Sequence, residues 1–138
     1  MTPEGSLLEE IKLTNGLSLF IYDQSRQLVG DRWLVKLLLF IPVRIKPQHF
    51  SHVPDAEKAY AAFVDAMGET IAIQQERHRN FIDRDEVSET LRQIKDEVLA
   101  TTLSYVSSVD LEARFIAKRY REWAEERRME RAGSNTSG

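Results

Sequence analysis

Two short turn signals constrain the fold of the first third of this chain. Asn15-Gly16 suits a two-residue type I′ turn, because both residues tolerate positive φ. Gly30-Asp31 has the composition of a type II′ turn, with glycine at the first central position. The stretches that flank these turns are rich in Leu, Ile, Val, Phe and Tyr. We therefore predict two successive hairpins that join residues 7–14, 17–22 and 32–45 into a three-stranded antiparallel β-meander.

The registers that follow from these turns predict one buried face. The first turn sets Ile11 opposite Phe20, and the second sets Tyr22 opposite Leu39. The shared face then carries alternate residues of all three strands: Ile11, Leu13, Phe20, Tyr22, Trp33, Val35, Leu37, Leu39, Ile41, Val43 and Ile45. A slip of one residue would turn a strand's whole set outward, so agreement between two independent turns favours this sheet.

The hydrophobic period becomes helical after Pro54. Apolar residues at 3–4 spacing predict a first helix from Ala56 that continues to Phe81. Asp83 and Glu86 resemble a capping box before a second helix over 87–105. A third helix carries Leu111, Phe115, Ile116, Tyr120 and Trp123. The sequence thus predicts a single α+β domain over residues 1–138. In it, a β-meander at 7–45 packs against about three helices at 55–131, with disordered tails at 1–6 and 132–138.

Composition excludes several classes of function. The 138 residues are 42% hydrophobic and 30% charged, which is ordinary for a globular chain. The net charge of −3 creates no positive field for nucleic acid or an anionic membrane, and the absence of cysteine removes thiol chemistry. The longest apolar run, 37–43, is far short of the roughly 20 residues of a membrane span. The first residues carry acids where a signal peptide needs basic and then apolar residues, so we expect a cytoplasmic protein without membrane contact.

Catalytic and metal-binding patterns are weak. His49 and His52, with Asp55 nearby, lack a supporting set of ligands such as HExxH. No G-x-S-x-G, P-loop or dinucleotide-binding motif occurs. We therefore expect structural histidines, no bound metal, no cofactor, no catalytic residue and no enzymatic activity. A metal-dependent enzyme centred on His49 and His52 is the third of three alternatives.

The stretch "DQSRQLVGDRW" is the most polar part of the predicted sheet. Its charged residues, Asp23, Arg26, Asp31 and Arg32, can form local ion pairs across the hairpin. They can also form a surface for a ligand or partner, because arginine binds carboxylates and phosphates with two hydrogen bonds. Nucleotide or nucleic-acid binding through Arg26, Arg32 and the basic last helix is the second alternative. Glutamates alternate with the arginines of that helix, so an ion-paired solvated surface is favoured there over nucleic acid.

Surplus apolar surface predicts self-association. A helix of more than 25 residues would be about 40 Å long at 1.5 Å per residue and would outrun the sheet. Trp123 has no evident partner within the chain. Large exposed apolar patches are uncommon on soluble monomers, and a two-fold dimer is the commonest way to cover one. The first of the three alternatives is therefore a non-enzymatic interaction or regulatory protein that forms a homodimer through its helices, with Phe81 and Trp123 as anchors.

The run "LTNGLSLFIYDQSRQLVGDRW" also carries a resemblance. Its N-G-L turn, followed by D-x-S-R and G-D-R-W, is similar to a group of small bacterial proteins of unknown function. The similarity covers the first third of the chain. It implies a bacterial, cytosolic setting, and it implies no activity, cofactor or catalytic residue.

Overall fold

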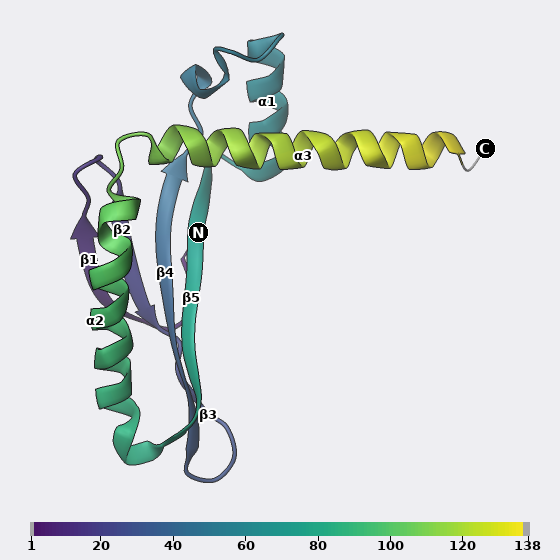
Figure 1. Ribbon diagram of the computed structural model, residues 1–138. Coiled ribbons are helices and arrows are strands. Elements are labelled where there is room, and N and C mark those ends of the chain that lie inside the picture. The colour runs from purple at the N-terminus through teal and green to yellow at the C-terminus, as the bar shows by residue number, and fades with distance from the viewer. Residues whose placement is uncertain (1, 137–138) are drawn as a thin grey trace. The chain divides into compact units, whose positions relative to one another are not determined.

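The computed structural model describes the backbone of residues 2–136 and the side chains of residues 2–133 (Figure 1). The fold is α+β, as predicted. The strands are β1 (Ser6–Lys12), β2 (Ser18–Asp23), β3 (Arg26–Gln27), β4 (Arg32–Arg44) and β5 (Thr70–Asp83). The helices are α1 (Ala56–Met67), α2 (Val87–Val106) and α3 (Leu111–Thr136), and the 3-10 turns are η1 (Pro47–Phe50) and η2 (Arg84–Glu86). No helix in the described part has both the length and the apolar composition needed to cross a bilayer.

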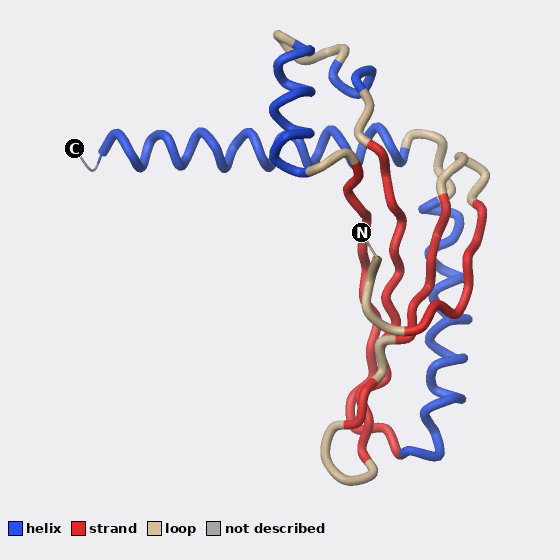
Figure 2. The backbone as a smooth tube through the Cα atoms, turned by 180° about the vertical axis from the view of Figure 1, so that it is seen from behind, coloured by secondary structure: helices blue, strands red, loops and turns tan. Residues whose placement is uncertain are grey.

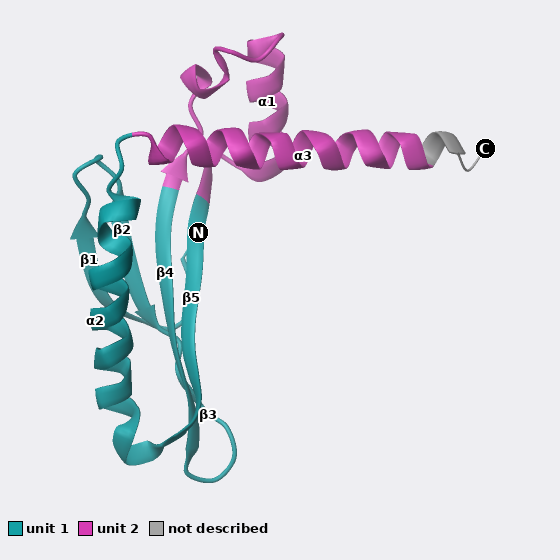
Figure 3. Cartoon of the chain, in the orientation of Figure 1, with its two compact units in different colours: residues 1–42, 72–109 teal, residues 43–71, 110–138 magenta. Residues whose placement is uncertain are grey.

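The chain forms two compact units, each built from two separate segments (Figure 3). Unit 1 consists of residues 1–42 and 72–109, and unit 2 consists of residues 43–71 and 110–138. The expected tails belong in part to these units, because β1 begins at Ser6 and α3 continues to Thr136. Residues 1, 137 and 138 of those tails lie outside the described residues.

The sheet has five strands, so the prediction of a three-stranded meander was too small. Strands β2 and β3 both pair with β4 in one antiparallel register, and β3 thus prolongs β2 after a break at Gln24-Ser25. Strand β1 pairs with β2, and β5 pairs with β4. The amide of Arg84, just past the end of β5, donates to Asp31 just before β4, and Ile45 donates to Glu69 at the other end. These two bonds show that β5 is antiparallel to β4.

The predicted register of the first hairpin was wrong by one residue. The amide of Gly16, at φ 91°, donates to the Leu13 carbonyl oxygen at 3.1 Å, and Leu13 pairs with Leu17 across a three-residue loop. A three-residue loop of this kind replaces the expected two-residue turn. Ile11 is consequently opposite Leu19 and not opposite Phe20.

The second hairpin contains the same error. The Gly30 turn forms where predicted, but Leu28 pairs with Arg32 and leaves a three-residue loop here too. Each error shifts the pairing of β2 with its neighbour by one residue. The faces of β1 and β4 are therefore as predicted, whereas the two faces of β2 are exchanged. The core face of β2 carries Leu19 and Ile21, at 1% and 0% exposure, in place of Phe20 and Tyr22. Five of the six predicted core residues of β4 are buried as expected: Val35, Leu37, Leu39, Ile41 and Val43. Trp33, the sixth, is only half-buried.

The prediction of one long helix from Ala56 to Phe81 was wrong. Helix α1 ends at Met67, and the amide of Gly68, at φ 86°, donates to the Val64 carbonyl oxygen. Glycine commonly ends helices in this way because it tolerates positive φ. The β-branched Thr70, Ile71 and Ile73 then begin β5. Phe81 therefore lies on a strand, where it is 71% exposed and has a φ of 57°.

Helix α2 runs along the strands of unit 1 and covers one face of its sheet (Figure 2). Its buried residues are Ile94, Val98, Thr102 and Val106, which repeat at the three- to four-residue spacing of one helix face. The side-chain amide of Asn15 donates to the Val106 and Ser108 carbonyl oxygens at 2.9 and 2.8 Å, which ties the first hairpin to the end of α2. The predicted capping box is absent, because Asp83 makes no capping bond and pairs with Arg32 instead.

Unit 2 is organised around an aromatic cluster. The ring of Phe50 lies 6.0 Å from that of Phe63 and 5.2 Å from that of Tyr120. The ring of Trp123 lies 5.4 Å from Phe63 and 5.8 Å from Tyr120, and the Arg127 guanidinium lies 4.8 Å from the Trp123 ring. Trp123 therefore has partners within its own chain, and the premise that it has none was wrong.

Candidate functional site

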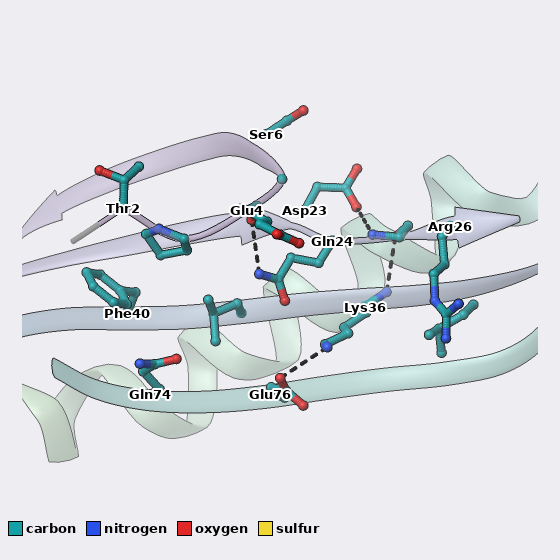
Figure 4. Close-up of a pocket in the computed structure, with 15 residues that line it drawn as sticks. Thr2, Glu4, Ser6, Asp23, Gln24, Arg26, Lys36, Phe40, Gln74 and Glu76 are labelled. Atoms are coloured by element: carbon teal, nitrogen blue, oxygen red, sulfur yellow. Dashed lines mark hydrogen bonds and ion pairs between the residues drawn. The ribbon is translucent and has the colours of Figure 1, made fainter.

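A polar groove of about 950 Å³ lies on one face of the sheet of unit 1 (Figure 4). Its floor comes from the alternate β4 residues Leu34, Lys36, Leu38 and Phe40. Successive residues of a strand point to opposite faces, so the groove lies on the face away from Val35, Leu37 and Leu39. The segment 2–6 and residues 23–26 provide one side of the groove, and Gln74 and Glu76 of β5 provide the other.

The segment 2–6 is held against the sheet through backbone contacts. The Gln24 side-chain amide donates to the Glu4 carbonyl oxygen at 3.0 Å. Gly5 has a φ of 101°, which L residues with side chains rarely adopt. Glycine at position 5 thus allows the chain to turn and form this side of the groove.

The Asp-x-Ser sequence explains how Arg26 reaches the groove. The Asp23 carboxylate accepts the amide hydrogen of Ser25 at 2.9 Å, which is a side-chain mimic of a backbone turn. The Ser25 hydroxyl accepts the amide hydrogen of Lys36 at 3.0 Å and replaces the ladder bond that the turn interrupts. Pairing with β4 then resumes at Arg26, opposite Leu34. The polar residues of this stretch therefore have a structural role that also places Arg26 in the groove lining.

The charges of the groove are only partly paired. The Lys36 ammonium lies 3.1 Å from the Glu76 carboxylate. Arg26 is exposed, and within residues 2–133 its guanidinium makes no hydrogen bond or ion pair. Five N–H donors of Arg26 are consequently free to bind an anion.

The structure brings together two of the four residues predicted for a ligand surface. Asp23 and Arg26 line the groove, whereas Asp31 and Arg32 do not. Arg32 forms an ion pair with Asp83 of β5. Its partner is therefore outside residues 23–33, where the sequence predicted it. Sequence reasoning missed Glu76, because residues 70–81 were interpreted as helix. The alternation of Thr70, Ala72 and Gln74 with two isoleucines was the available signal.

The histidines of the third alternative lie in unit 2. The His49 ring accepts the Lys46 amide hydrogen on Nδ1 at 3.0 Å, and its Nε2 lies 3.1 Å from the Glu112 carboxylate. Both ring nitrogens of His49 therefore have partners in the fold. In the described part of the chain, no three His, Asp or Glu side chains gather in a way that would hold a metal ion.

Comparison of the chain with protein-family models, with curated proteins and with solved structures found no match. The chemistry of the groove is therefore the basis on which a function can be inferred. It offers one unpaired guanidinium, several amides and carboxylates, and an apolar floor.

Proposed function

We propose that unit 1 is a non-catalytic interaction domain that binds, in the groove, a segment of a partner protein with a single acidic side chain. The Arg26 guanidinium contacts a carboxylate of that segment, because arginine can bind a carboxylate through two parallel hydrogen bonds. The observation that supports this proposal is the contrast between two cations of the groove. Lys36 is neutralised by Glu76 at 3.1 Å, whereas Arg26 has no anionic partner within residues 2–133.

The balance of charge favours a peptide over a nucleotide or nucleic acid. Three carboxylates, those of Glu4, Asp23 and Glu76, line the groove together with two cations. A ligand with several phosphates would meet this negative excess at close range, and like charges repel more strongly near a protein surface than in bulk water. A peptide segment brings a single carboxylate together with amide donors for the acceptors of the groove. It can also place an apolar side chain over Leu38 and Phe40.

The polar groups of the groove favour binding over catalysis. A serine nucleophile needs a neighbouring base, and histidine is the usual one. Ser25 is occupied as an acceptor for the Lys36 amide, and no histidine is among the groove residues. The proposed function is therefore non-enzymatic. The cytoplasmic and bacterial settings remain predictions from the sequence.

Peptide selection on the full chain tests this proposal. Random heptapeptides are displayed, enriched on the immobilised protein, and measured by calorimetry together with versions in which each Asp or Glu becomes Asn or Gln. We expect enrichment of acidic peptides, and a loss of about ten-fold or more in affinity for Arg26→Ala, since one charge-assisted hydrogen bond supports at least that difference. Arg44→Ala is the matched control, because Arg44 is an exposed arginine of β4 outside the groove. Enriched peptides without acidic residues, or equal affinity for Arg26→Ala, would contradict the proposal.

We also propose that the chain forms a homodimer. Trp123 packs against Phe63 and Tyr120, so it no longer indicates a surplus apolar surface. Phe81 keeps a side chain that is 71% exposed, and a second copy of the chain could cover it. It lies on β5, so the proposed contact is no longer one made by helices alone.

A further inference from the structure

Unit 2 contains a second, smaller cavity of about 280 Å³ between η1 with the loop after it and α3. Its apolar lining consists of Phe50, Val53, Pro54, Ile116, Ala117 and Tyr120. Phe50 and Ile116 are 1% and 0% exposed, whereas His52 and Arg121 of the same lining are exposed. The cavity therefore has an apolar interior and a polar side that faces solvent.

One wall of this cavity is fixed by a cluster of hydrogen bonds. Because Nδ1 of His49 accepts the Lys46 amide hydrogen, the neutral ring carries its proton on Nε2 and donates it to Glu112 at 3.1 Å. The Lys46 ammonium lies 3.1 Å from the same Glu112 oxygen. These bonds connect η1 to the first turn of α3 and hold the two sides of the cavity in place. Such preformed hollows with a few polar groups are typical of small-molecule sites.

The ionisable lining of the cavity selects for negative charge. No carboxylate is among the residues that line it. The side chain of Arg121 makes no ion pair or hydrogen bond within residues 2–133, and the same is true of His52. His49 is already engaged by Lys46 and Glu112, so Arg121 and His52 are the nitrogen donors of the lining that are available to a ligand.

We propose that this cavity binds a small monocarboxylate that carries an apolar ring or branched chain. The carboxylate binds the Arg121 guanidinium, with His52 as a second donor, and the apolar body lies against Phe50, Ile116 and Tyr120. The volume of 280 Å³ lies just under the range of roughly 300–1,000 Å³ that is typical of small-molecule pockets. This size excludes nucleotides and acyl lipids. The site is formed by unit 2 alone, so it does not depend on the function proposed for unit 1.

Two probes and their amides test the site on the full chain. The probes are 3-phenylpropionate, which has a ring, and 4-methylpentanoate, which has a branched chain. Amide ¹H–¹⁵N spectra are recorded at up to about 10 mM of each probe, a concentration that detects millimolar affinity. We expect saturable shifts at residues 49–54 and 116–121, and affinity lower by about ten-fold or more for the uncharged amides.

Three substitutions separate this site from unspecific binding. Arg121→Ala should weaken the binding of both acids by about ten-fold or more, whereas Arg131→Ala, an exposed arginine further along α3, should leave it unchanged. Ala117→Leu should reduce binding by filling the cavity, and Arg121→Ala carries the test if that variant does not fold. The absence of saturable binding for both acids, equal binding of the amides, or shifts confined to the groove of unit 1 would overturn the proposal.

Discussion

The Asp23 carbonyl oxygen occupies the space that a side chain at position 5 would need, since a Cβ atom on Gly5 would lie 2.4 Å from it. Real Cβ atoms do not approach backbone oxygens so closely, and the φ of 101° adds strain for any other residue. One side of the polar groove therefore depends on the absence of a side chain at this position.

Gly5→Ala should release the segment 2–5 from the sheet. We expect the hydrogen bond from Gln24 to Glu4 to break, and the free energy of unfolding to fall by about 1–3 kcal/mol from the strained backbone. Hydrogen exchange and amide chemical shifts at residues 23–26 report the change. Gly16→Ala is a matched control. Gly16 also has a positive φ, but a Cβ atom added there would meet no other atom within 4 Å. Equal changes at residues 23–26 in both variants would show that the close approach to Asp23 is unimportant.

Leu39→Ala should be strongly destabilising. Leu39 is 3% exposed and lies opposite Ile21 in the centre of the sheet. Truncation of a buried leucine to alanine costs about 2–5 kcal/mol, part of it from the cavity that remains. Urea denaturation measures this loss, and Leu7→Ala, at a 51% exposed leucine of β1, should change stability by less than about 0.5 kcal/mol. Comparable losses in the two variants would contradict the observed face of β4.

The faces of β1 and β4 could be predicted from the sequence, but that of β2 could not. Alternation along each strand determines which residues share a face, whereas loop length determines how two strands align. Asn15-Gly16 fits a two-residue loop by composition. The additional contacts of the Asn15 side chain are with Val106 at the end of α2 and with Ser108 just after it, 91 and 93 residues away. A local pattern contains no information about a partner so distant in sequence.

The interpretation of residues 70–81 as helix failed for a different reason. Ile71 and Phe81 fit a helical continuation of α1, and the polar residues between them fit either period. The positive φ of Gly68 ends the helix, and the long partner strand β4 then determines that this segment becomes a strand. Strand β5 provides one side of the groove, and the sequence predicted a helix there. Of the residues predicted for a ligand surface, only Asp23 and Arg26 therefore line the groove.

Phe81→Asn should stabilise the fold. Phe81 has a φ of 57°, a conformation that is rare for a bulky residue and several times commoner for asparagine. Its side chain is 71% exposed, so little packing is lost, and we expect a gain of about 1 kcal/mol in the free energy of unfolding. Thermal or urea denaturation measures it. Val29→Asn removes another exposed apolar side chain, at ordinary φ, and should have no comparable effect.

The same variant tests the proposed homodimer. Sedimentation of the wild type at micromolar concentration should give about twice the 16.0 kDa mass of the chain, because a two-fold dimer is the commonest closed assembly. Phe81→Asn should shift the distribution toward 16.0 kDa, and Val29→Asn should not. A wild-type chain that sediments at 16.0 kDa under these conditions would end the homodimer proposal.

Glu89 on α2 should titrate below the ordinary range of a glutamate. A hydrogen bond from the Arg92 guanidinium, three residues along the helix, lowers the pKa of the Glu89 carboxyl. Because the folded-state pKa is the lower one, the stabilising contribution of this pair is present at neutral pH and is lost as the pH falls through that value. Carboxyl NMR titration measures the pKa directly, and Arg92→Ala should raise the pKa of Glu89, because the largest of its causes is removed. A titration of Glu89 that Arg92→Ala leaves unchanged would rule out the guanidinium as the cause.

The interleaving of the two units has a consequence for biosynthesis. When residue 109 has left the ribosome, both segments of unit 1 are available to fold, whereas unit 2 has only residues 43–71. At that point Phe50 and Phe63 lack their packing partners Tyr120 and Trp123, which belong to the helix that is translated next. Exposed aromatic surface on a nascent chain is where chaperones bind and where aggregation begins. Slow translation after residue 109 would therefore prolong the interval in which this chain is most vulnerable.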